Sequence, residues 1–95
     1  MIHSHPHPGE VLKETVFAPL NLSVDEVAAR LDFPLAELAG IVAGQAPITP
    51  ELALRIEKAG VSTAQFWLRL QSNYDLWRIQ RQGALAVRPL QPAAI

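Results

Sequence analysis

The sequence contains no cysteine, which excludes disulfide bridges, a thiolate nucleophile and cysteine ligands for a metal. It also lacks any apolar run of transmembrane length, and its polar amino terminus does not look like a signal peptide. The net charge is only −1, so there is no overall electrostatic attraction to nucleic acid. From these absences we expect a cytoplasmic chain of one small domain, without a membrane partner.

Catalytic signals are equally scarce. No glycine-rich phosphate loop is present, and no hydroxyl residue has a histidine and an acid in its sequence context. His3, His5 and His7 alternate near the amino terminus, a pattern that can bind metal, but Pro6 interrupts it and no carboxylate cluster completes a site. We therefore expect no enzyme activity, no cofactor and no metal site, and we expect residues 1–7 to form a flexible tail.

What the sequence does contain is a series of helix start and stop signals. The segment Ser23–Glu26 has the form of a capping box, and Thr49 followed by Pro50 is a second helix start. Pro34 interrupts one helical pattern, and Gly44 suits the end of the next. The signals predict an all-α fold without strands, one domain over 8–82, and a flexible tail over 83–95. Five helices are expected, over 8–17, 23–31, 35–43, 49–59 and 63–82.

The helix predicted over 63–82 contains both tryptophans and the only tyrosine of the chain. Apolar side chains recur at helical spacing on two of its sides, so both sides need burial. One side can meet the core and the other a second copy of the chain, which predicts a homodimer; a single wide core face is the alternative. The candidate core or interface residues are Phe66, Trp67, Leu70, Tyr74 and Trp77, and Leu68, Leu76 and Ile79 mark the other side.

Several short motifs carry a family resemblance. They are His7-Pro8-Gly9-Glu10, Leu22-Ser23, Gly44, Ile48-Thr49, Ala53-Leu54-Arg55, and the run Phe66-Trp67-Leu68-Arg69-Leu70-Gln71-Ser72-Asn73-Tyr74-Asp75-Leu76-Trp77. Over residues 7–81 the chain resembles HigA-type antitoxins, within the lambda-repressor/Cro-like (XRE-type) helix-turn-helix superfamily. The run from Phe66 is the specific part, because a helix-turn-helix alone is a common arrangement.

The resemblance implies a five-helix, lambda-repressor-like domain with a helix-turn-helix over 23–44, a long carboxy-terminal helix, and a homodimer. It also implies a toxin partner, a small RelE-like endoribonuclease that cuts mRNA on the ribosome. An antitoxin of this type neutralises its toxin and represses the shared operon by binding a palindromic operator.

If the helix-turn-helix docks as others do, outward residues of the helix over 35–43 face the bases of double-stranded DNA. The candidate DNA-binding residues are Ser23, Leu35, Ala36, Glu37, Ala39, Gly40 and Gln45. Alanine methyls suit thymine, and a carboxylate can accept from cytosine N4, but none of these side chains offers guanine the two donors that arginine does.

Charge is divided unevenly along the chain. Residues 1–49 contain two basic and six acidic residues, a net charge of −4, whereas residues 50–95 contain six basic and three acidic residues, a net charge of +3. A DNA-binding face is usually basic, so two functions remain open. The chain is either an antitoxin that also represses transcription, or an antitoxin whose helix-turn-helix no longer reads DNA. A regulator without a toxin is a third possibility.

Overall fold

The computed structural model describes residues 5–91, which form helices and loops and contain no strand. In chain order the elements are α1 (Pro8–Leu12), the π-helical η1 (Lys13–Phe17), α2 (Val24–Leu31), α3 (Leu35–Val42), α4 (Pro50–Lys58) and α5 (Ala64–Arg81). Within these residues the prediction of an all-α fold with five helices is confirmed, since η1 continues α1 without a break.

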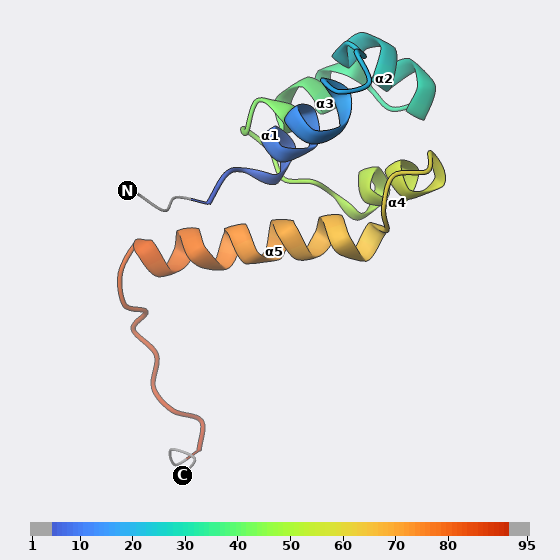
Figure 1. Ribbon diagram of the computed structural model, residues 1–95. Coiled ribbons are helices and arrows are strands. Elements are labelled where there is room, and N and C mark those ends of the chain that lie inside the picture. Colours follow the sequence, from blue (N-terminus) through green and yellow to red (C-terminus); the bar gives the residue numbers. More distant parts are fainter. Residues whose placement is uncertain (1–4, 92–95) are drawn as a thin grey trace.

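α5 runs along one side of the molecule, as Figure 1 shows, and α4 and α1 pack on it. α3 contacts both α1 and α2, so the amino-terminal helices form one group above α5. The described part of the carboxy-terminal segment leads away from the end of α5 (Figure 1) and is exposed throughout. The helix-turn-helix is therefore joined to α5 mainly through α1, α4 and the loop between α3 and α4.

The helix starts follow the predicted capping chemistry. The Ser23 hydroxyl accepts from the Glu26 N–H at 3.2 Å, and the Glu26 carboxylate accepts from the Ser23 N–H at 2.9 Å, which completes the capping box. Thr49 caps α4 by accepting from the Leu52 N–H at 3.2 Å, and Thr63 caps α5 in the same way. Each cap satisfies a backbone N–H that the helix itself leaves without a partner.

The first helix differs from the continuous one expected over 8–17. After Leu12 the chain widens into the π-helical turn η1, in which the Ala18 N–H donates to the carbonyl of Lys13 at 2.9 Å. The Thr15 hydroxyl donates to the Val11 carbonyl at 2.6 Å. This side-chain bond competes for a carbonyl that the backbone ladder of a regular α-helix would use.

The core contains the apolar face of every helix. Leu12, Leu38 and Leu52 have no exposed surface, and Trp67 is only 2% exposed. The remaining buried apolar residues are Phe17, Val27, Ala28, Leu31, Phe33, Ile41, Val42, Ile48, Ala53 and Ile56. On α4, Leu54 is exposed, whereas its neighbour Ala53 is buried.

α5 does not bury its aromatic side chains as one set. Trp67 and Gln71 are the residues of α5 that are buried, and Trp67 donates its indole N–H to the Val61 carbonyl at 3.2 Å. Leu70, Tyr74 and Trp77 are half-buried. Phe66 is exposed, as are Leu76 and Ile79 on the other side of the helix. The expected aromatic face is thus divided between core, groove and surface.

The amino-terminal segment is more ordered at His7 than the expected tail. The imidazole is buried, and its Nδ1 accepts from the Gly9 N–H at 2.9 Å, so His7 is the amino-terminal cap of α1. Its ring also lies edge-on to Tyr74 of α5. The expectation of a flexible tail through residue 7 is therefore wrong at His7, because its ring accepts a hydrogen bond from the Gly9 N–H and packs against Tyr74.

Candidate nucleic-acid interface

The turn between α2 and α3 sets the angle of the helix-turn-helix. Asp32 adopts a left-handed conformation (φ +52°), which a short polar side chain tolerates better than most. The Phe33 N–H then donates to the Ala28 carbonyl at 3.0 Å, and the Phe33 ring is buried. Because Ala28 is small and buried, α2 and α3 can approach closely at this point.

α3 presents the side that was predicted to face DNA. Leu38, Ile41 and Val42 point into the core, so the residues between them are turned outward. The predicted contact residues Leu35, Ala36, Glu37 and Ala39 are exposed, and Gly40 is half-buried. The outward face of α3 is thus apolar around one carboxylate. Apart from its chain neighbours and the backbone of α3, no atom lies within 4 Å of where a Gly40 Cβ would stand.

The start of α2 is less open to phosphate than its sequence suggested. The Ser23 N–H and the Glu26 N–H are both used within the capping box. Hydrogen bonds from the Ser23 backbone and from its hydroxyl lower the pKa of the Glu26 carboxyl, which keeps it ionised. A negative charge therefore lies beside Ser23, one of the residues predicted to bind DNA.

Charge on the helix-turn-helix itself is strongly one-sided. Between residues 23 and 44 the only basic residue is Arg30, against Asp25, Glu26, Asp32 and Glu37. Arg30 is exposed and lies beside an apolar hollow formed by α1, η1, α2 and α4 rather than on the outward face of α3. Cations for a DNA backbone must therefore come from other elements.

The loop that follows α3 is tied to α5 by a buried side chain that sequence reasoning missed. Gln71 accepts from the Ile48 N–H at 2.8 Å and donates to the Asp75 carboxylate at 3.0 Å. Gln45, the predicted contact in this loop, is exposed. The signal for Gln71 was its position four residues after Trp67, on the same inward side of the helix. Its amide fixes the loop that carries Gln45.

The described amino-terminal histidines, His5 and His7, have packing and capping roles. His3 lies outside the described residues. The His5 ring packs against the Trp77 ring, with 4.9 Å between their centroids, and Nδ1 of His7 accepts the hydrogen bond that caps α1. Across residues 5–91 no three histidine or acidic side chains are placed to share a metal ion. Over the same residues no helix has the length and hydrophobicity needed to cross a membrane.

Similar proteins identify the family. Virulence-associated protein A of Dichelobacter nodosus is 40% identical over 91 residues, covering 95% of this chain and 89% of that protein. An antidote protein of the HigA family from Coxiella burnetii superposes with a TM-score of 0.78 at 32% identity, over 84% of this chain and 87% of its own. No model of a protein family matches the sequence.

The chain belongs to the HigA family of helix-turn-helix antitoxins. The structure of Pseudomonas aeruginosa antitoxin HigA with the higBA promoter is similar as well, with a TM-score of 0.80 at 28% identity over 92% of this chain and 99% of that chain. Other relatives are described as helix-turn-helix transcriptional regulators. The family is thus one of antitoxins and transcriptional regulators.

The HigA-family motif at residues 7–10 has a packing role in this structure. A Cβ added to Gly9 would lie 1.8 Å from the carbonyl oxygen of Ile41 in α3. Only glycine allows the start of α1 to approach the α3 backbone so closely. Together with the His7 cap, this contact fixes α1 against the carboxy-terminal part of α3.

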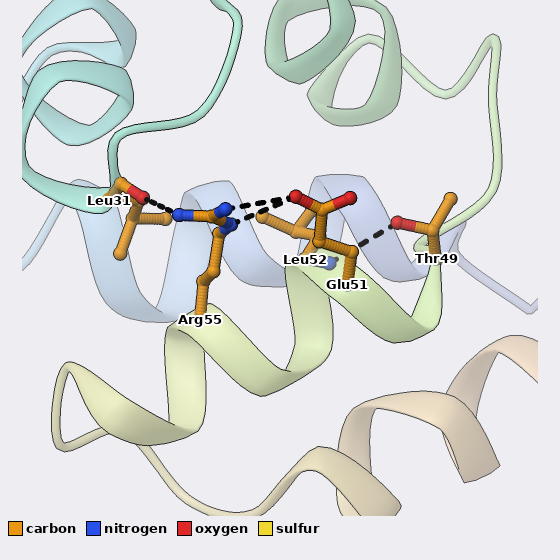
Figure 2. Close-up of polar contacts among 5 residues, drawn as sticks. All are labelled: Leu31, Thr49, Glu51, Leu52 and Arg55. Carbon is orange, nitrogen blue, oxygen red and sulfur yellow. Dashed lines mark hydrogen bonds and ion pairs between the residues drawn. The ribbon is translucent and has the colours of Figure 1, made fainter.

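A second HigA-family motif residue, Arg55, connects α4 to the helix-turn-helix. Figure 2 shows its guanidinium between Glu51, at 3.0 Å, and the Leu31 carbonyl at the end of α2, to which Nη1 donates at 2.9 Å. An arginine suits this position because its planar group can donate in two directions at once. The basic charge of Arg55 is therefore paired within the fold.

Proposed function

We propose that this HigA-family protein neutralises a RelE-like toxin that cuts mRNA on the ribosome, and that its homodimer represses the shared operon. The observation that supports this most directly is the similarity to an antitoxin solved with its promoter DNA, combined with an α3 whose outward face is free of packing contacts. Both parts of the proposal concern binding, which agrees with the absence of a catalytic set in the sequence.

On DNA, α3 enters the major groove and the two halves of the dimer read a pseudo-palindrome about one helical turn apart. Ala36 and Ala39 contact thymine methyls, and Glu37 accepts from a cytosine N4 amino group. With so little direct readout, operator shape supplies much of the discrimination. Gln45 contributes a phosphate contact from the loop after α3.

The toxin part of the proposal is tested by co-expression. The adjacent open reading frame is expressed from an inducible promoter with and without this chain. We expect growth to be restored and the two proteins to copurify. Persistent toxicity without a complex would exclude the antitoxin function, and a neighbouring frame that encodes no small toxin would favour a regulator that acts alone.

A second candidate function is supported by the acidic charge of residues 23–44 and by the occupied amides of the capping box. In this alternative the protein binds only the toxin, and the helix-turn-helix serves as a scaffold. Promoter DNA that is bound no better than random DNA, by a protein that still neutralises the toxin, would support it.

A further inference from the structure

A polar hollow separates the loop after α3 from α5. Its volume is ≈ 180 Å³. Residues 44–47 form one wall, His7 forms a second, and α5 contributes Gln71, Asp75 and Arg78. The hollow therefore brings Gln45, the predicted phosphate contact, to the same depression as a basic side chain from a helix outside the helix-turn-helix.

The polar groups around the hollow differ in charge and in the hydrogen bonds that they already make. Gln71 and Asp75 are joined to each other at 3.0 Å, and Gln71 also holds the Ile48 N–H. His7 uses Nδ1 to cap α1, and burial lowers its pKa, so it is neutral at pH 7. Arg78 is exposed and, within residues 5–91, has neither an ion pair nor a hydrogen bond with another side chain. It is the permanent cation of the hollow.

We propose that Arg78 of α5 contacts the DNA phosphate that lies beside Gln45, and so supplies from outside the helix-turn-helix a cation that α2 and α3 lack. This inference rests on the proposed binding of operator DNA. The end of a recognition helix and the loop after it run next to the DNA backbone when the helix start faces the bases. A guanidinium at that loop offers a phosphate two parallel donors, which Gln45 cannot.

Asp75 does not cancel this contact. Its Oδ1 accepts from Gln71, so one oxygen of the carboxylate is already used in a hydrogen bond within α5. Gln71 also anchors Ile48, so the loop is held at a fixed distance from α5 while Arg78 remains exposed at the rim. The geometry thus places an exposed basic side chain beside a loop that Gln71 anchors.

The chain contains a matched control. Arg69 is also exposed and also lies on α5, but it is nine residues away, about two and a half helical turns, and therefore on the opposite side of the helix. Arg78→Ala and Arg69→Ala make the same change in charge and length. Only the first removes a cation from the hollow beside Gln45.

The test measures the affinity of each variant for the protein's own promoter fragment, by fluorescence anisotropy at several salt concentrations. A lost phosphate contact lowers the steepness of log affinity against log salt by about 0.9 for each protomer. We expect this reduction in Arg78→Ala, equally for promoter and random DNA, and no change in Arg69→Ala. Arg78→Gln, with circular dichroism to show that it is folded, repeats the test with a side chain of similar length.

The outcomes separate this inference from the proposed function. Equal salt dependence in the wild type and both Arg78 variants overturns the phosphate contact, even where the promoter is bound specifically. A reduced salt dependence in the Arg78 variants, with no preference for promoter over random DNA, supports the contact and rejects specific repression. No DNA binding by the wild type at low salt rejects both.

Discussion

The amino-terminal cap of α1 depends on the protonation state of His7, and therefore on pH. Burial lowers its pKa below the ordinary value of 6.5; the carboxylates of Glu10 and Asp75 act in the opposite direction, and Arg78 adds to the lowering. The neutral ring is required because Nδ1 accepts the Gly9 N–H. Protonation would remove that acceptor and place a positive charge at the amino-terminal end of a helix, where positive charge is unfavourable.

The pH dependence of stability follows from this cap. Because the pKa of His7 is lower in the folded state, the unfolded state takes up the proton first as the pH falls. The contribution is therefore complete above about pH 6.5 and is lost as the pH decreases through the lowered pKa. Urea unfolding between pH 7.5 and pH 5 should show this loss in the wild type and less of it in His7→Asn, which keeps a capping acceptor that does not titrate. Identical pH dependence in the two proteins would argue against the cap.

Substitution by alanine is expected to have opposite effects on stability at Gly9 and at Gly40. Gly9→Ala places a methyl group against the Ile41 backbone, which cannot rotate away, so we expect a loss of about 3 kcal/mol or more. Gly40→Ala meets nothing within 4 Å and should increase stability by up to about 1 kcal/mol through helix propensity. Chemical denaturation measures both, and similar effects at the two sites would contradict the close approach of α1 to α3.

At the scale of whole elements, α5 has two kinds of surface. Trp67 and Gln71 join it to α4 and to the loop after α3, and both are buried. Leu76 and Ile79, three residues apart and therefore on one side of the helix, are 56% and 40% exposed. Apolar side chains on the surface of a long helix suit an interface between two copies, which agrees with the homodimer in the proposal.

Substitutions on this surface should convert the dimer to a folded monomer. Sedimentation of the wild type at micromolar concentration should give about twice 10.4 kDa. Leu76→Lys combined with Ile79→Lys should give the monomer, because two charges would have to be buried. Arg69→Ala is a control on the same helix. A wild type that sediments only as a monomer would exclude the homodimer.

The sequence predicted elements more reliably than it predicted side-chain partners. Caps such as Ser23 and Thr49 are local, because the acceptor and its donor lie three residues apart. The π-helical turn and the Gln71–Ile48 bond depend on groups that only packing brings together. Phe66 was grouped with Leu70 and Tyr74 by helical spacing, yet it is exposed, because spacing defines a face and not the depth to which a neighbouring element covers it.

At the scale of the molecule, an acidic amino-terminal half and a basic carboxy-terminal half are joined by α4 and by the loop after α3. The outward face of α3 is consequently poor in cations, so under the proposed function we expect DNA binding to release few counterions. We expect the slope of log promoter affinity against log salt concentration to be shallower than the slope of about −10 seen for lac repressor. A steep dependence, measured by filter binding across a salt series, would show that more cations contact DNA than this fold places near α3.

Binding to the protein's own promoter is the most direct test of the central claim, repression through the helix-turn-helix. The protein is titrated on promoter and random fragments at low and moderate salt, alone and with the toxin. Glu37→Ala changes the outward face of α3, and Leu54→Ala is a control on the exposed surface of α4. We predict preferential promoter binding that Leu54→Ala leaves unchanged. Glu37→Ala should either tighten binding to all DNA or lose discrimination at a cytosine position. Promoter and random DNA bound equally at low salt, with and without toxin, would contradict the claim.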